Sequence, residues 1–293
     1  MLILVTGAAG RTGRAAIRAL AARGVDVRAL VRRPEQAAAV RNVGAAEVTV
    51  GDLRDKGVLR RAVQGTAGTY YIAPPLHPDE VSVGERLIAA QRDAAAERLV
   101  YHSVLHPHID DLPHHLMKLR MERLVIDCGL AYTILQPGRY MQDLLPHRYE
   151  VGMHGVYREP YSVLAPFSWV ALQDVAEVAA RVIAEPGHDA ATYELAGPEP
   201  LNSVQVAEGW EQALGRSVRA ETVPAGDWAA SLSRSGIGGY SLEAIGCMVA
   251  YYHRRGLVGN SNALAWLLGR PPTRLADFLR TAVRELEVPG RRT

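Results

Sequence analysis

Short apolar runs alternate with Ala- and Leu-rich stretches along the first half of the chain, and this alternation restricts the fold more than any other feature. The apolar runs predict six buried strands, over Leu2–Thr6, Val25–Val31, Glu47–Val50, Thr69–Ile72, Leu99–Ser103 and Tyr132–Leu135. The stretches between them predict helices, over Arg14–Arg23, from Pro34, and over Lys56–Val63, Glu80–Ala96 and His114–Cys128. Because alternating strands and helices form right-handed βαβ units, we expect an α/β fold of the Rossmann type, with a doubly wound parallel sheet.

The second half of the chain is less regular and predicts a smaller α+β part. Short strand-like pieces are expected between residues 151 and 170, where Gly, Pro and aromatic residues are mixed. Further elements are expected as helices over Asp174–Ala184 and Ser203–Leu214 and as strands over Thr192–Leu195 and Ala220–Val223. We expect residues 1–150 to form the main domain and residues 151–293 a substrate-binding cap interleaved with the sheet, because ligands bind outside the carboxyl ends of parallel strands.

The composition is that of an ordinary globular protein, with 293 residues, 48% hydrophobic and 22% charged. A formal net charge of +2 excludes the strongly basic field of a nucleic-acid-binding protein. The two cysteines, Cys128 and Cys247, match no metal or disulfide spacing and indicate a reducing compartment. No run reaches the roughly 18 apolar residues of a membrane span. We expect a cytoplasmic monomer or homodimer that acts on a small molecule, without a nucleic-acid or membrane partner.

Three glycines, Gly7, Gly10 and Gly13, follow directly on the first strand and open the first helix. A dinucleotide site needs glycine for the tight turn, for close approach of the backbone to the pyrophosphate, and for helix–strand packing. The N-terminus of the helix then offers N–H groups and a partial positive charge to the phosphates. We expect these glycines, with Arg11 and Thr12, to bind a dinucleotide; the alternative is a Gly-rich turn without a ligand.

The end of the second strand distinguishes between two cofactors. An NAD site places an Asp or Glu there to bind the ribose, whereas this chain carries Arg32 and Arg33 and no acid. A guanidinium group suits a 2′-phosphate, and Arg11 could add a second contact. We therefore expect NADP(H), bound by residues 1–150; the alternative is a pair of solvated arginines.

Further cofactor-binding candidates lie where other strands end, because ligands gather at that edge of the sheet. They are Asp52 and Leu53 after the third strand, Ala73 and Pro74 after the fourth, and Pro137 and Tyr140 after the sixth. Asp52 could accept a hydrogen bond from the adenine amino group, or it could instead cap the following helix, as Asp55 could. Tyr140 and Met141 are expected to border the nicotinamide and the substrate.

Several runs together resemble the NmrA-like group of atypical short-chain dehydrogenases. They are Thr-Gly-Ala-Ala-Gly-Arg-Thr-Gly at 6–13, Val-Arg-Arg-Pro at 31–34, Gly-Asp-Leu at 51–53, Lys-Leu-Arg-Met-Glu at 118–122, Tyr-Thr-Ile-Leu-Gln-Pro-Gly at 132–138, Asp-Val-Ala-Glu at 174–177 and Tyr-Glu-Leu-Ala-Gly-Pro at 193–198. The resemblance implies a Rossmann domain, a small C-terminal substrate domain and NADP(H) binding. Members of the group include quinone and phenylpropanoid-type reductases, and also regulators that bind the dinucleotide without turning it over.

The resemblance also implies catalytic candidates. A typical short-chain dehydrogenase uses Tyr-x-x-x-Lys with a Ser; here Ser103 and Lys118 stand at the Ser and Lys positions, and His114 stands at the Tyr position. Lys56 and Lys118 are the only lysines, and an amine can shed a proton near neutral pH as Arg cannot. Three interpretations remain open: His114 donates the proton, Lys118 acts alone, or the site is inactive and Lys118 only binds the ribose.

Half of the ten histidines lie between His102 and His115, in a segment with two prolines. Their spacing matches no zinc motif, so we expect no metal and a loop that lines the substrate entrance. The four tryptophans, Trp169, Trp210, Trp228 and Trp266, are expected to be packing residues.

The leading hypothesis is an NADP(H)-dependent oxidoreductase that reduces a small carbonyl, quinone or enone. Hydride would come from the nicotinamide, and Lys118, Ser103 or His114 would handle the proton. Two alternatives remain: a non-catalytic regulatory protein that senses NADP(H), and an isomerase or cyclase that uses the cofactor without net consumption.

Overall fold

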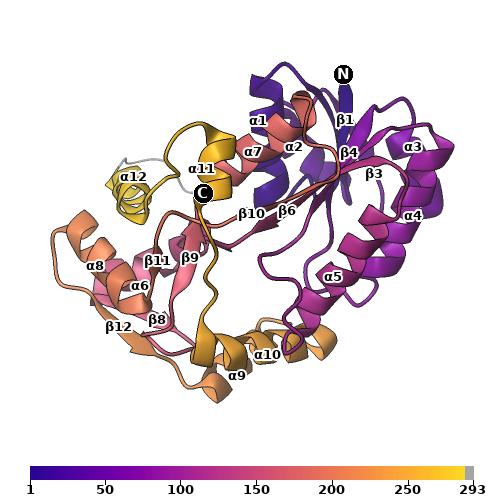
Figure 1. The fold of residues 1–293 in the computed structure, drawn as a ribbon. Coiled ribbons are helices and arrows are strands. Elements are labelled where there is room, and N and C mark those ends of the chain that lie inside the picture. Colours follow the sequence, from indigo (N-terminus) through magenta and orange to yellow (C-terminus); the bar gives the residue numbers. More distant parts are fainter. Residues whose placement is uncertain (288–293) are drawn as a thin grey trace. The chain divides into compact units, whose positions relative to one another are not determined.

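In the computed structural model, residues 1–287 are described, and the chain divides into two compact units (Figure 1). The first unit contains residues 1–110, 114–136 and 173–193, and the second contains 111–113, 137–172 and the chain from Glu194. Both units are therefore discontinuous in sequence. The division into a cofactor-binding part, 1–150, and a substrate-binding cap, 151–293, stays a prediction. The last six residues of this predicted cap, 288–293, lie outside the described residues.

A seven-stranded sheet forms the centre of the first unit, in the order β10–β6–β5–β4–β1–β2–β3. The strands are β1 Leu2–Val5, β2 Asp26–Val31, β3 Glu47–Val50, β4 Gly68–Ile72, β5 Arg98–His102, β6 Ala131–Pro137 and β10 Ala191–Leu195. The pairings from β6 across to β3 are all parallel. The expected α/β class, a Rossmann-type parallel sheet with smaller C-terminal sheets, is confirmed.

Helices cover both faces of this sheet (Figure 1). They are α1 Arg11–Ala22, η1 Pro34–Gln36, α2 Ala37–Arg41, α3 Lys56–Val63, α4 Glu80–Asp93, α5 Pro113–Ile126 and α7 Leu172–Ala184. In Figure 1, α3, α4 and α5 lie along one side of the sheet, and α1 and α7 lie along the other. Apolar side chains of α3, α4 and α5 pack with those of β1, β4, β5 and β6 in one core cluster, which fixes the carboxyl ends of these strands.

Two small sheets, six α-helices and one 3₁₀ helix make up the described part of the second unit. The sheets contain β7 Arg139–Tyr140, β9 Phe167–Val170 and β11 Pro200–Leu201, and β8 Val156–Glu159 with β12 Arg219–Thr222. The helical segments are η2 Met141–His147, α6 Arg148–His154, α8 Ser203–Leu214, α9 Ala225–Arg234, α10 Gly239–Arg255, α11 Asn262–Leu268 and α12 Leu275–Glu287. Within residues 1–287, helices long and apolar enough to cross a bilayer are absent.

Two expectations about the second unit were wrong. The strand-like pieces expected between residues 151 and 170 are present as β8 and β9, but residues 151–154 belong to helix α6, which ends at Gly155 in a left-handed conformation. The four tryptophans do not all pack in the core. Trp169 and Trp210 are fully buried, but the side chain of Trp266 is 76% exposed.

Candidate functional site

The turn between β1 and α1 requires glycine at positions 7 and 13. Gly7 has a φ of 57°, and its carbonyl accepts a hydrogen bond of 3.0 Å from the amide of Gly10. A Cβ atom on Gly13 would lie 2.4 Å from the carbonyl oxygen of Gly7 and 2.6 Å from the Cα of Ala8, both backbone atoms that cannot move aside. The N-cap residue of α1, Gly10, has no side chain to bond the first amides of the helix. A helix that begins in this way can bind phosphate oxygens.

This turn lies where the strand order reverses, because β1 stands between β4 and β2. The hydroxyl of Thr6 donates to the carbonyl of Ile72 and accepts from its amide, both at 2.9 Å. A Cβ on Gly7 would lie 3.1 Å from the Ile72 side chain. The glycine turn and the residues after β4, Ala73 and Pro74, therefore meet at the carboxyl edge of the sheet, which is the ligand-binding place in doubly wound folds.

A charged rim follows the neighbouring strands β2 and β3. Arg32 comes directly after β2 and is exposed, and Asp52 and Leu53 come after β3. Arg54, which sequence reasoning missed, forms two hydrogen bonds of 2.7 and 3.0 Å with the Asp52 carboxylate. These bonds, and more weakly the charge of Arg32, lower the pKa of Asp52 to about 2. The N-cap of α3 is Asp55 and not Asp52, so the Asp52 carboxylate pairs with Arg54 instead of capping the helix.

Lys118 on α5 lies in a buried polar cluster with Glu80, the first residue of α4. Its Nζ atom is 2.8 Å from Oε1 of Glu80, and the hydroxyl of Tyr101 on β5 donates to the same oxygen at 2.8 Å. Nζ also lies 5.5 Å from the centroid of the Tyr101 ring. Lys118 is 6% exposed and Glu80 is fully buried. Sequence reasoning missed Glu80, because an acidic residue in the first turn of a helix is common.

Ser103 joins the same cluster from the end of β5. Its hydroxyl donates a short hydrogen bond to Glu122, and the amide of Gln136 donates to both oxygens of that carboxylate, at 2.9 and 3.0 Å. Burial raises the pKa of Glu122. Tyr101 and Ser103 are two residues apart on a strand and so share a face, while Lys118 and Glu122 are one turn apart on α5. The structure thus brings Ser103 and Lys118 to one side of the sheet.

His114 lies one turn before Lys118 on α5. Its pKa was expected to suit proton transfer near neutral pH, but it is lower. Burial, and then the positive charge of Lys118, lower the pKa of His114 to about 3. Its imidazole is therefore neutral at pH 7. His102 on the opposite face of β5 also has its pKa lowered to about 3, mainly by burial, and its Nδ1 lies 2.6 Å from the hydroxyl of Tyr70.

The histidines after β5 show no arrangement typical of a metal site. Over residues 1–287, no group of three or more His, Cys, Asp or Glu side chains is placed to hold a metal ion. The ring of His115 lies 3.0 Å from the backbone oxygen of His106 and is buried. The expectation that this segment lines a substrate entrance stays a prediction.

The last candidates from the sequence, Pro137 and Tyr140, belong to the second unit. Tyr140 lies on β7, which pairs with β9, and the following residue, Met141, is buried. Arg139, the neighbour of Tyr140 on β7, has its guanidinium 2.7 Å from Glu159 and 4.2 Å from the ring centroid of Trp169. The proposed contacts of Pro137 and Tyr140 with a cofactor stay predictions.

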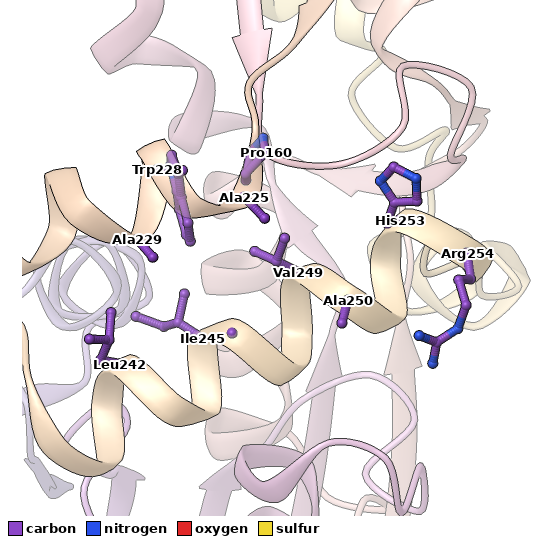
Figure 2. A pocket seen from close by; sticks show the side chains of 11 residues that line it. Pro160, Ala225, Trp228, Ala229, Leu242, Ile245, Val249, Ala250, His253 and Arg254 are labelled. Atoms are coloured by element: carbon purple, nitrogen blue, oxygen red, sulfur yellow. The ribbon is translucent and has the colours of Figure 1, made fainter.

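A cavity of about 270 Å³ lies between α9 and α10 in the second unit. Figure 2 shows Trp228 of α9 pointing toward Ile245 and Val249 of α10. The walls also contain small residues, among them Ala229 and Gly246, and a Cβ on Gly246 would meet no atom within 4 Å. Helix α9 has no fully buried residue, and its Trp228 and Ala229 are half-buried at the cavity wall.

Comparison with known proteins adds three similar reductases. A model of the NmrA-like family matches residues 1–276. An NAD(P)H azoreductase of Xenophilus azovorans is 28% identical over 284 residues, which are 95% of this chain and 97% of that protein. A (4-alkanoyl-5-oxo-2,5-dihydrofuran-3-yl)methyl phosphate reductase of Streptomyces griseus is 33% identical over 223 residues, 75% of this chain and 76% of that protein. The crystal structure of an NADPH-dependent quinone oxidoreductase of Escherichia coli, complexed with NADPH, matches with a TM-score of 0.82 and 27% identity, covering 98% of this chain and 100% of that one.

Proposed function

This chain belongs to the NmrA-like family, and from that premise we propose that it is an NADP(H)-dependent reductase of a small conjugated acceptor, such as a quinone, an enone or another activated carbonyl. The observation that carries the proposal is the glycine turn at the reversal of strand order, with an arginine rim beside it. The names of the three relatives support the acceptor class, because an azo group, a quinone and an acyl-dihydrofuranone are all conjugated groups that accept electrons.

The backbone of the turn suits the pyrophosphate of a dinucleotide, since a side chain at Gly13 would collide with the backbone of Gly7 and Ala8, and side chains at Gly7 and Gly10 would crowd the turn. In this proposal the amides of Arg11 and Thr12 bind the phosphates, and Arg32 binds the 2′-phosphate. The remaining cofactor contacts are assigned to Asp52, Leu53, Ala73, Pro74, Lys118, Pro137 and Tyr140. When bound, NADPH supplies the hydride.

A carbonyl that accepts hydride develops negative charge on its oxygen, and that oxygen needs a proton. We assign this proton to the ammonium group of Lys118, which is held 2.8 Å from Glu80. Ser103, anchored by Glu122, would orient the acceptor oxygen. His114 is assigned no acid role, because its low pKa leaves it without a proton to spare at pH 7.

We propose that the cavity between α9 and α10 of the second unit binds a planar ring. The flat indole of Trp228 and the aliphatic side chains opposite it suit a planar apolar ring (Figure 2). His253 and Arg254 lie at the end of the same cavity and could bind an oxygen substituent of that ring. The class of ligand is therefore a planar ring with carbonyl or anionic substituents.

The cofactor part of the proposal is tested by calorimetric titration with NADPH, NADP, NADH and NAD. We expect Arg32→Ala to weaken NADPH binding by about 10- to 100-fold, because a charge-assisted hydrogen bond is worth about 1.5–3 kcal/mol. NADH binding should remain unchanged. Arg41→Ala is the matched control, since Arg41 is an exposed arginine at the end of α2 and has no proposed contact with the phosphate. If none of the four nucleotides binds the folded protein, the proposed function is wrong.

A second candidate function, a protein that senses NADP(H) without turnover, is favoured by one observation. The Nζ atom of Lys118 is already paired with Glu80, and a histidine stands at the usual tyrosine position. A sensor would bind NADPH in the titration but would not oxidise it with menadione or with any other conjugated acceptor. NADPH oxidation that is abolished in Lys118→Ala would exclude the sensor.

A further inference from the structure

The carboxylate of Glu80 has no role in the sequence motifs, yet it is the most completely buried acidic group near Lys118. One oxygen, Oε1, binds both the Lys118 ammonium and the Tyr101 hydroxyl at 2.8 Å. The other oxygen, Oε2, is buried without a hydrogen-bond partner among the described residues. Lys118 forms the direct ion pair with this carboxylate, while Arg86 of the same helix adds a positive charge near Tyr71, whose pKa is raised by burial and also by Glu80.

The surroundings of Lys118 explain why it needs this partner. Burial favours the neutral form of an amine, so an ammonium group without a counter-ion gives up its proton at a lower pH. The nearby histidines, His102, His114 and His115, are neutral at pH 7 because their pKa values are lowered. Glu122 also interacts with Lys118 through space, but its own oxygens are engaged by Ser103 and Gln136. The direct ion pair is with Glu80.

We propose that Glu80 is a positioning residue that keeps Lys118 charged and holds its Nζ atom in one place above the Tyr101 ring. The role of Lys118 as proton donor rests on the proposed function, whereas the effect of Glu80 on the charge of Lys118 does not. Glu80 is the first residue of α4, and α4 follows the loop after β4. The ion pair therefore links Lys118 to the strand end beside the glycine turn.

The chain allows an unusually direct test, because it contains only two lysines. In a protein labelled with ¹⁵N at lysine Nζ, NMR should show two side-chain signals, one from buried Lys118 and one from exposed Lys56, which serves as internal control. The wild type gives the reference pH at which the Lys118 signal titrates. In Glu80→Gln the Lys118 signal should titrate at least one pH unit lower, and the Lys56 signal should not move.

Glu85→Gln is the matched control variant, because Glu85 is exposed on the same helix, and it should leave both signals unchanged. The proposal is overturned if the Lys118 signal titrates at the same pH in the wild type and in Glu80→Gln. If Glu80→Gln does not fold, the wild type decides alone: a Lys118 signal that titrates well below that of Lys56 would show that Glu80 does not hold the charge.

The pH dependence of kcat provides a second readout, which would not change if Glu80 had only a structural role. A lysine acid is active while protonated, so activity is lost as the pH rises. In Glu80→Gln the alkaline fall of kcat should therefore move down by the same shift as the NMR signal, with the KM for NADPH unchanged. Glu80→Asp keeps the charge and should restore the pH of this fall. If the wild type has no turnover, the proposed function fails while the NMR result still decides the role of Glu80.

Discussion

Several polar residues of the first unit are buried beside the candidate site, and their protonation is set by their neighbours. Nδ1 of His102 lies 2.6 Å from the hydroxyl of Tyr70, and burial of the ring lowers the pKa of His102 to about 3. Ser103, the next residue, faces the other side of the sheet and is bonded to Glu122. The two faces of the sheet at the end of β5 therefore differ: one carries the neutral imidazole of His102, and the other carries the charged groups near Ser103.

The low pKa of His102 leads to a prediction of how the free energy of unfolding depends on pH. An unfolded histidine binds a proton near pH 6.5, whereas folded His102 resists protonation down to about pH 3, so the unfolded state gains protons first on acidification. Stability is therefore complete above pH 6.5 and falls below it, by about 1.4 kcal/mol per pH unit for this residue. Denaturant unfolding at pH 7 and 5.5 should show that His102→Gln loses about 1 kcal/mol less than the wild type between the two pH values.

The control for this experiment is His154→Gln, because His154 is exposed on α6 and should leave the pH dependence unchanged. Equal losses in the wild type and in His102→Gln would show that His102 is not the group responsible. The comparison uses differences between variants, so other groups that titrate in the same range do not affect it.

At the candidate site, the residues found from sequence are those that carry a local signal. Gly13 follows from its spacing, and Arg32 from the end of a strand. Glu122 could also have been found, since it lies four residues after Lys118 and eight after His114, on one helical face. Glu80 could not, because its pairing with Lys118 joins two helices that are separated by β5, and no pattern within one segment reports it.

At the scale of elements, capping signals explain which boundaries were predicted well. The bounds of α3 and α8 agree with expectation, because Asp55 and Asn202 cap them and Gly215 ends α8. The end of α4 was placed three residues too late, since Ala95 adopts a positive φ although alanine favours helices. Helix α6 was missed because it is seven residues long, contains Gly152 and lacks a side-chain cap.

The helix pair α9 and α10 leads to a prediction about the acceptor. Ala229 lines the cavity and Ala230, the next residue, does not and is exposed. Ala229→Phe should fill the cavity and raise the KM for menadione about 10-fold, which corresponds to about 1.4 kcal/mol. Ala230→Phe adds the same side chain on the outside of α9 and should leave the KM unchanged. Steady-state kinetics with NADPH measures both, and equal KM values in the two variants would place the acceptor elsewhere.

At the scale of the whole molecule, the chain leaves the first unit after residue 136 and returns to it at residue 173. Residues 173–193 supply α7 and the segment that leads into β10. The guanidinium of Arg98 binds the carbonyl of Val182 at 3.2 Å, and the hydroxyl of Thr133 binds that of His188 at 2.7 Å. Several side chains of α7 are fully buried, among them Val175 and Val178. The first unit is thus incomplete without a segment that lies far along the sequence.

We therefore predict that residues 1–150 do not fold when expressed alone. Each buried aliphatic side chain lost with α7 removes about 1.5–3 kcal/mol, so a few of them cancel the 5–15 kcal/mol that stabilises a typical domain. A chain that joins residues 1–136 to 173–193 through a flexible linker restores α7 and should regain a cooperative thermal transition, with NADPH binding weakened by loss of the contacts proposed for Pro137 and Tyr140. Circular dichroism and calorimetry compare the two chains. A cooperative transition with NADPH binding in residues 1–150 alone would show that the nucleotide site needs no part of the chain beyond that point.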